Sequence, residues 1–350
     1  MCPRTGKNQK TNVFILTGPT ASGKSAAVLA IAPRLNAEII SADSMQVYRG
    51  MDIGTAKPTP EERARTPHHL LDIRDPWESF SVADFITEVE TAIADIHSRG
   101  KNALLVGGTP MYLKGFVKGL FAGPPADWPL RRELMARAER EGVPALHAEL
   151  ARIDPVAARR IHVNDLRRIV RALEVYAKTR RPISHLQQQW DSPAFAKATA
   201  DLPAFAKATA DLPAFAAAKE GAAELPKTAQ RRFAGAILVR SRQDLCARID
   251  ARVKQMFQSG LVAEVRRLLA DPRGMGRGAR QALGYKEVVA HLEGQRSLEE
   301  TIALVQLRTR QFAKRQMTWF RSFKDFAWIE AAPDAVADEV AESVLKAFGA

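Results

Sequence analysis

The chain of 350 residues is 46% apolar, so it is long enough to bury at least one large hydrophobic core. Lys and Arg number 52 against 39 Asp and Glu, which gives a formal net charge of +13. That excess favours a polyanionic partner, nucleic acid ahead of a membrane surface, although a soluble basic surface has the same composition.

The cysteine and hydropathy patterns argue against the secreted and membrane classes. The two cysteines, Cys2 and Cys246, are too few for a disulfide framework or a structural zinc site. The apolar run at 13–16 is too short for a signal peptide, and the sequence has no apolar stretch of about 18 residues. We therefore expect a cytoplasmic protein that does not bind a membrane.

The first third of the chain alternates strand and helix patterns. Apolar runs at 12–18, 37–44 and 102–109 predict strands, and helical patterns at 25–35 and 81–100 lie between them. Ser81 precedes the second helix as an N-cap, and Gly100 ends it. This alternation is typical of a parallel α/β sheet.

The middle of the chain has a different character. The segment "GPPADWP" at 123–129 breaks the pattern, and 130–190 is predicted to be helical and is rich in arginine. The ten-residue segment "PAFAKATADL" then occurs twice from 193, with a truncated third copy. A period of ten is too short for a solenoid unit, so we predict a flexible insert that buries little apolar surface.

A strand pattern returns at 233–239 and further helices follow it. The last long helix begins with a capping box, "SLEE", at Ser297 to Glu300. We divide the chain into a core at 11–121, a helical, arginine-rich domain at 122–190, the low-complexity insert at 191–229, and a second part of the core with C-terminal helices at 230–335.

The segment "GPTASGKS" fits the phosphate-binding loop pattern between a strand and a helix. It comprises Gly18, Pro19, Thr20, Ala21, Ser22, Gly23, Lys24 and Ser25. Its glycines let backbone N–H groups converge on anionic oxygens at a helix N-terminus, Lys24 adds a charge, and Ser25 is a candidate Mg²⁺ ligand. The fold class is therefore α/β, with a P-loop NTPase-like parallel sheet and an inserted all-helical domain.

The acidic residue that usually accompanies such a loop is only weakly indicated in this sequence. Nucleoside triphosphatases place a metal-binding Asp after a second apolar strand, but the strand at 102–106 runs into Gly107, Gly108 and Thr109 without a carboxylate. An acid, Asp43, follows the other strand instead. A ligand that carries a diphosphate and is not ATP becomes a serious candidate.

Six segments in order resemble one family. They are "GPTASGKS", "ISADSMQVYRGMDIGTAKP", "PHHLLDIRDPWESFSVADF", "LLVGGTPMYLKG", "RIHVNDLRRIVRALEVY" and "RQALGYKEV". Together they resemble the tRNA dimethylallyltransferases, the tRNA isopentenyltransferases of bacteria. The similarity runs from about Val13 to about Trp328 and is interrupted only by the repeat insert.

This resemblance implies a reaction and its partners. A dimethylallyl group would pass from dimethylallyl diphosphate, with Mg²⁺, to the exocyclic amine of the adenosine just 3′ of the anticodon, releasing diphosphate. The anticodon stem-loop of the tRNA would lie between the core and the helical domain. We expect a monomer.

The resemblance also implies roles for single residues. Asp43 would be the base that accepts the amine proton, and its alternative is a Mg²⁺ or helix-cap carboxylate. The Thr109 hydroxyl would steady the amine or a bridging phosphate oxygen, and its alternative is a turn threonine. Arg242 aligns with a family arginine for the diphosphate, although a plain surface arginine fits the sequence equally well.

Several residues are candidates for RNA contact. The resemblance assigns this role to Asp43, Ser44, Met45, Gln46, Thr109, Arg131, Gln281, Gly284, Tyr285 and Lys286, with Tyr285 suited to stack on a base. Asp165 is the predicted N-cap of the next helix, whose first turns carry Arg167, Arg168 and Arg171. The helix dipole disfavours cations there, so an approaching polyanion explains them, and a tolerated basic face is the alternative.

Other interpretations remain open on the residues alone. His68 and His69 lack the carboxylate or cysteine neighbours of a metal site, and we expect their segment to order a loop beside the donor. A small-molecule P-loop kinase, a prenyltransferase of free adenine nucleotides and an RNA-binding protein with a relict nucleotide site are the competing functions. The intact Lys24 and Ser25, with Asp43 and Thr109, argue against the last.

The composition of the repeat predicts that it is dispensable. Deletion of 193–218 should leave the transfer rate and the melting temperature close to those of the full chain, because this composition buries little apolar surface. A radiolabel transfer assay and a thermal melt check this. Loss of activity in a variant that remains folded would contradict it.

Overall fold

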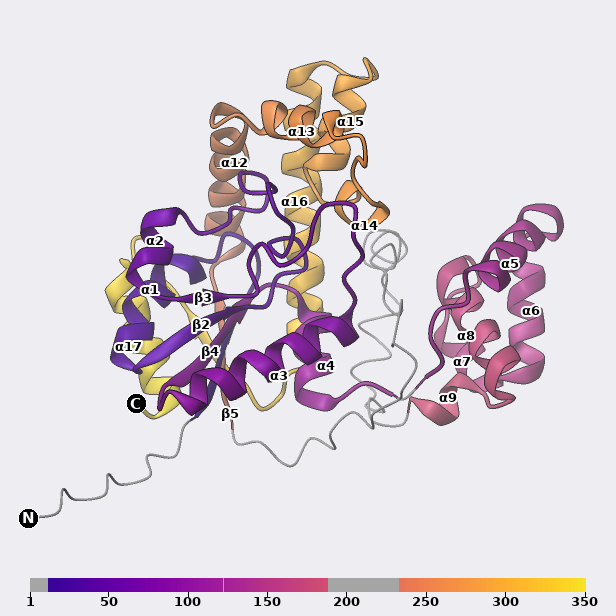
Figure 1. The fold of residues 1–350 in the computed structure, drawn as a ribbon, viewed down its shortest axis with the longest axis horizontal. Coiled ribbons are helices and arrows are strands. Elements are labelled where there is room, and N and C mark those ends of the chain that lie inside the picture. Colours follow the sequence, from indigo (N-terminus) through magenta and orange to yellow (C-terminus); the bar gives the residue numbers. More distant parts are fainter. Residues whose placement is uncertain (1–11, 122, 188–232) are drawn as a thin grey trace, which may run out of the picture.

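The computed structural model of the protein describes residues 12–121, 123–187 and 233–350. The predicted low-complexity insert at 191–229 lies outside these residues. The described chain forms a parallel sheet with helices on both faces, a group of helices above its carboxyl edge, and a separate helical domain (Figure 1).

The sheet has six strands, and all of its pairings are parallel. In sheet order the strands are β3 (His68–His69), β2 (Ala37–Ser41), β4 (Asn102–Gly107), β1 (Val13–Thr17), β5 (Phe233–Val239) and β6 (Ala327–Glu330). The chain passes from β1 over β4 to β2 and later returns to β5 on the other side of β1. Its strand order thus reverses beside β1, where α/β folds place their ligands.

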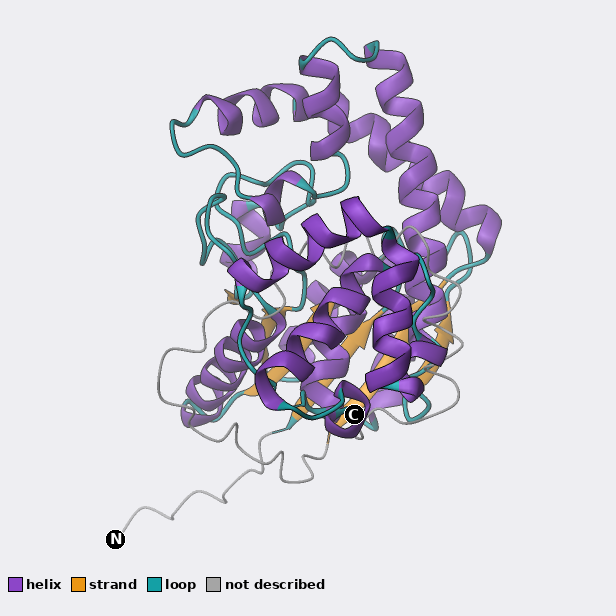
Figure 2. Ribbon diagram, turned by 90° about the vertical axis from the view of Figure 1, so that its right-hand side faces the viewer, coloured by secondary structure: helices purple, strands orange, loops and turns teal. Residues whose placement is uncertain are grey.

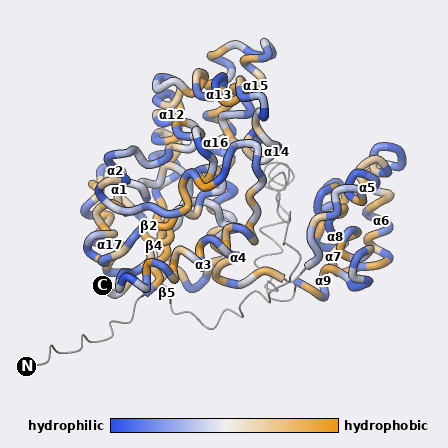
Figure 3. The backbone as a smooth tube through the Cα atoms, in the orientation of Figure 1, coloured by the Kyte–Doolittle hydropathy of each residue, from blue (hydrophilic) through white to orange (hydrophobic). Residues whose placement is uncertain are grey.

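Side chains along each strand alternate between the two faces of the sheet, so each face has its own hydrophobic core. Phe14 and Leu16 point to one face and pack with α1 (Lys24–Arg34) and α17 (Ala337–Phe348). Val13 and Ile15 point to the other face and pack with α3 (Val82–Ser98) and α4 (Pro110–Lys118). Figure 2 shows the strands enclosed by helices, and Figure 3 shows apolar residues along the central strands.

The helical domain has a hydrophobic core of its own. Its helices are α5 (Trp128–Glu141), α6 (Val143–Ile153), α7 (Pro155–Arg160), α8 (Leu166–Thr179) and α9 (Ile183–Leu186). Leu146, Leu150 and Ile169 are fully buried within it, in a cluster separate from those of the sheet. The predicted inserted helical domain is therefore present.

The remaining helices rise from the carboxyl edge of the sheet (Figure 1). They are α12 (Arg242–Gln258), α13 (Leu261–Ala270), α14 (Arg277–Arg280), α15 (Tyr285–Leu292) and α16 (Leu298–Phe320), while the short α2 (Pro60–Arg65) lies in the β2–β3 connection. None of the helices in the described residues has the length and apolarity needed to cross a membrane.

The helix starts predicted from the sequence at Ser81, Asp165 and Ser297 are confirmed, whereas the strands β3 and β6 and the helices α2, α4, α14, α15 and α17 were not predicted. Ser81 caps α3, Asp165 caps α8, and Ser297 caps α16 with the expected capping box. The prediction missed β3 and β6, since two and four residues carry little periodic signal. The predicted core ended at 335, but α17 lies beyond it and packs on α1.

A cluster of charges joins the amino-terminal ends of β2 and β4 to β3 and to the carboxyl end of α3. Glu38 in β2 is 2% exposed and accepts hydrogen bonds from Arg99, from Lys101 Nζ (2.8 Å) and from His69 Nε2 (2.7 Å). The Arg99 guanidinium, followed by the other two donors, holds the pKa of the Glu38 carboxyl far below its usual range, against the opposing effect of burial.

We predict that Glu38→Gln lowers the melting temperature at neutral pH by a few degrees, since Arg99 and Lys101 lose their counter-charge. A carboxyl with a depressed folded pKa stabilises the protein above its unfolded pKa of about 4.3 and loses this effect as pH falls below it. The difference in melting temperature between the two proteins should begin to shrink below about pH 4 and continue to shrink as the pH falls toward the much lower folded pKa. A gap that stays constant down to low pH would contradict this assignment.

Candidate active site

The phosphate-binding loop follows β1 and ends where α1 begins. Gly18 has φ +151°, and a Cβ built there would lie 2.1 Å from Leu238 O in β5, so only glycine fits. Lys24 Nζ donates to Gly18 O and Pro19 O, both at 2.8 Å. Burial, together with the positive charge of Arg252, lowers the pKa of Lys24 to about 7, although Asp43 acts in the opposite direction.

Side chains from distant parts of the chain, one just after β5 and two in α12 and α16, hold this loop from outside. Arg240 Nε donates to Ser22 O at 3.0 Å, and Arg248 Nε donates to Ala21 O at 3.2 Å. Gln316 in α16 accepts from Thr20 N at 2.9 Å and donates to Gly108 O. Neither the loop motif nor the strand pattern signals these three residues, because they lie more than two hundred residues further along the chain.

Asp43 lies just past the carboxyl end of β2, as predicted. Its Oδ1 accepts from Met45 N at 2.8 Å and from Gln46 N at 3.3 Å, which fixes the carboxylate over its own turn. Thr109 Oγ1 accepts from Ser44 N at 3.1 Å, so the end of β4 supports the same turn. Thr109 retains its own hydroxyl hydrogen for donation.

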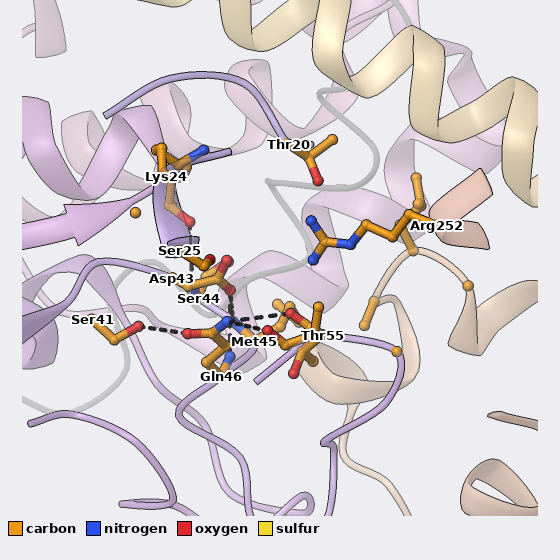
Figure 4. Close-up of a pocket in the computed structure, with 18 of the residues that line it drawn as sticks. Thr20, Lys24, Ser25, Ser41, Asp43, Ser44, Met45, Gln46, Thr55 and Arg252 are labelled. Atoms are coloured by element: carbon orange, nitrogen blue, oxygen red, sulfur yellow. Dashed lines mark hydrogen bonds between the residues drawn. The ribbon is translucent and has the colours of Figure 1, made fainter. Parts of the chain in front are cut away.

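A cavity of about 240 Å³ brings most of the candidate site residues together. The predicted residues that line it are Thr20, Lys24, Ser25, Asp43, Ser44, Met45, Gln46, Thr109, Gln281, Gly284 and Tyr285. Figure 4 shows Lys24 and Ser25 on one side, Asp43 in the middle, and Arg252 reaching toward them from α12. Apolar residues complete the wall, among them Val253, Met256 and Phe312.

The prediction for Arg242 requires a correction. Arg242 is the exposed first residue of α12 and does not line the cavity, whereas Arg252 of the same helix does. The two are ten residues apart, which is about 15 Å along a helix. Burial lowers the pKa of the Arg252 guanidinium, and the carboxylate of Asp43 opposes this shift. The arginine of α12 that lines the cavity is therefore Arg252.

The expected role of Tyr285 as a stacking platform also requires a correction. Its ring is fully buried and its hydroxyl donates to Glu264 Oε1 at 2.5 Å, so the ring is a packed part of the cavity wall and not an exposed platform for a base. Gln281 lies at the cavity instead, and Lys286 is exposed on α15.

The arginines of the helical domain are partly committed to its own structure. Arg131 and Arg171 both pair with Glu174, which is fully buried, and Arg171 also donates to Pro124 O at 2.9 Å. This internal pairing explains Arg171 without a polyanion. Burial lowers the pKa of Arg167 to about 10, and the nearby charge of Arg277 in α14 adds to this. Arg168 lies 3.5 Å from the capping Asp165.

The two histidines have structural partners. His69 binds Glu38, and His68 Nδ1 lies 2.7 Å from Thr66 O while its side chain borders the cavity. Within the described ranges, no cluster of three or more His, Cys, Asp or Glu side chains is arranged to hold a metal ion. A cation at this site would depend on Ser25 and on oxygens of the ligand.

Fold and cavity together define an α/β P-loop protein whose site joins an anion-binding loop, an acid and apolar walls. A family model described as IPP transferase matches residues 46–323. A tRNA dimethylallyltransferase of Geobacter metallireducens is 46% identical over 324 residues, 93% of this chain and 94% of that protein. One of Geobacter sulfurreducens is 43% identical over 340 residues, 97% of this chain and 98% of that protein.

Solved structures agree with this result. A tRNA isopentenylpyrophosphate transferase from Bacillus halodurans has a TM-score of 0.64 and 37% identity, covering 97% of this chain and 96% of that one. A eukaryotic dimethylallyltransferase acting on tRNA has a TM-score of 0.68 and 28% identity, covering 92% and 74% respectively. The chain belongs to the IPP transferase family, and it is a transferase. The resemblance seen in the six motifs is confirmed.

The lowered pKa of Lys24 predicts that binding of an anion takes up a proton. A nearby diphosphate raises this pKa again, so above pH 7 the affinity of the wild type for inorganic diphosphate should fall by up to about tenfold per pH unit. Lys24→Arg keeps its charge throughout and should show a smaller pH slope. The affinity of both proteins is measured by calorimetric titration between pH 6 and 9. Because the protonation of diphosphate itself is common to both proteins, it cancels in the comparison. Equal slopes of affinity against pH would exclude Lys24 as the titrating group.

Proposed function

We propose that this protein transfers the dimethylallyl group of dimethylallyl diphosphate to the exocyclic N6 of the adenosine 3′-adjacent to the anticodon of tRNA. The observation that carries the proposal is one cavity that Lys24, Arg252 and Asp43 line together. An allylic diphosphate needs cations at its leaving group, and an aromatic amine needs an acceptor for its proton. The membership of the IPP transferase family supports the same reaction.

These residues suit the following steps of the proposed reaction. The adenine N6 attacks C1 of the dimethylallyl group while the bond between C1 and the bridging oxygen breaks, and its electron pair leaves with the diphosphate. Lys24, Arg252 and the amides at the start of α1 stabilise the charge that develops on that oxygen. The N6 proton passes to the Asp43 carboxylate.

Asp43 is oriented for this task. Both of its hydrogen bonds to backbone amides end on Oδ1. Oδ2 is therefore the atom that we assign to the amine proton. Thr109, which supports the turn at Ser44, would direct its hydroxyl hydrogen to the bridging oxygen.

A magnesium ion fits the loop, although the described residues contain no cluster of acids to hold it alone. Ser25 stands at the start of α1 and lines the same cavity as Asp43, so its hydroxyl and the diphosphate oxygens would be the ligands. When bound, Mg²⁺ would neutralise part of the charge of the leaving group.

The RNA would approach over the carboxyl edge of the sheet. The cavity, at about 240 Å³, has the size of a small-molecule site, so we expect a macromolecule to present a single base to it. Anticodon-loop bases are already unpaired, which lowers the cost of turning one inward. Lys286 and the basic residues near Arg167 and Arg277 are suited to the backbone on either side.

One assay separates this proposal from its competitors. Purified protein with Mg²⁺ and labelled dimethylallyl diphosphate is given tRNA, free AMP or no acceptor, and a parallel reaction contains labelled ATP. Label in tRNA, removed by mutating the adenosine beside the anticodon, is the expected result. Label only in AMP, or turnover only with ATP, would identify a nucleotide prenyltransferase or a kinase instead.

Asp43→Ala should reduce kcat for tRNA by about 10²- to 10⁴-fold, since it removes the proton acceptor. Binding of tRNA in a filter assay should remain within about twofold of the wild type, because most of its contacts lie elsewhere. Asp43→Asn, which preserves the shape and can still accept from the turn amides, is the matched control and should lose activity as well. Retained turnover in both variants would remove Asp43 from the mechanism.

A further inference from the structure

Glu264 in α13 presents a buried carboxylate to the wall of the cavity. It is 2% exposed, and four donors surround it. Oε2 accepts from Asp52 N at 3.0 Å and from Ile53 N at 2.8 Å, while Oε1 accepts from Gly54 N at 3.3 Å and from Tyr285 Oη at 2.5 Å. None of these four donors carries a charge, so the carboxylate depends on their geometry.

The loop that Glu264 holds by these hydrogen bonds has no room to move toward α13 and α15. A Cβ at Gly54 would lie 2.4 Å from the ring of Tyr285 and 2.9 Å from Leu261, so the loop packs directly on α13 and α15. Lys57, whose side chain is buried, donates from Nζ to Tyr48 O at 2.7 Å and to Asp52 Oδ1 at 2.6 Å. The loop is therefore held by Lys57 as well as by Glu264.

The residues that follow connect this loop to the reacting carboxylate. Gly54, Thr55 and Ala56 line the cavity. Gln46 Nε2 donates to Thr55 O at 3.2 Å and to Ala56 O at 3.3 Å. The backbone N–H of Gln46 in turn donates to Asp43 Oδ1 (Figure 4). A shift of the loop held by Glu264 thus reaches Asp43 through one side chain.

We propose that Glu264 is a positioning residue, which fixes the loop Asp52–Ala56 and through Gln46 aims Asp43 at the acceptor amine. The proposal rests on the proposed function of the cavity. It also explains why Tyr285 is buried: its hydroxyl is the fourth donor to the same carboxylate. Because Glu264 does not line the cavity, its loss should affect the chemical step more than the binding of the donor.

Glu264→Gln is the sharpest test, because it keeps the volume but turns one acceptor oxygen into a donor that faces a backbone N–H or the phenol. We expect kcat with tRNA to fall about 10- to 100-fold, with KM for dimethylallyl diphosphate within about twofold of the wild type. Tyr285→Phe, which removes one donor and keeps the ring, should cause a smaller fall in kcat.

The matched control is Glu38→Gln, another buried carboxylate, at the amino-terminal end of β2 and away from the cavity. It should lower the melting temperature without changing kcat at 25 °C. Two outcomes would overturn the proposal. In one, kcat of Glu264→Gln falls no more than the fraction of folded protein does; in the other, only KM changes.

Hydrogen exchange provides a readout that does not depend on activity. In Glu264→Gln the amides of Asp52, Ile53 and Gly54 should exchange faster, and the turn at Met45 and Gln46 should follow, while α5–α8 are unchanged. Protection from exchange equal to that of the wild type at these amides would exclude a role of Glu264 in fixing the loop. If the wild type transferred no label to tRNA, the proposed function would fail, yet exchange would still decide whether Glu264 fixes this loop.

Discussion

The site depends on holding two cations and one carboxylate around a single cavity. Lys24 comes from the loop after β1, Arg252 from α12 and Asp43 from the end of β2. Burial lowers the pKa of both cations, and the positive charge of Arg252 lowers that of Lys24 further, while the carboxylate of Asp43 opposes both shifts. Burial of apolar residues on the two faces of the sheet supplies the free energy that offsets the cost of burying these cations.

This arrangement requires elements from both ends of the chain. The phosphate-binding loop is clamped by Arg240, Arg248 and Gln316, and the opposite wall is clamped by Glu264. All four lie after the segment at 188–232, whereas the loop and Asp43 come before it. The α12–α16 helices are therefore part of the active site, because without them neither wall has its outer hydrogen-bond partners.

The parts of the site that were predicted from the sequence are those set by local rules. A glycine-rich loop between strand and helix, and an acid just past the next strand, meet because the carboxyl ends of parallel strands share one edge. The helix ends were predicted because Ser81, Asp165 and Ser297 cap them with local hydrogen bonds. The errors concern which side of a helix faces inward. Arg242 and Arg252 belong to one helix, and composition alone does not distinguish the exposed guanidinium from the one at the cavity.

The sequence by itself determined four of the six strands, the loop, the family and the separate helical domain, since periodicity and short motifs act over a few residues. Only the tertiary structure decided that Arg131 and Arg171 neutralise Glu174 and that Tyr285 and Glu264 fix a loop more than two hundred residues away. The physical reason is that the partner of a buried charge or hydroxyl is chosen by packing in space. Burial makes an unmatched polar group costly, and which group matches it depends on how the whole chain folds.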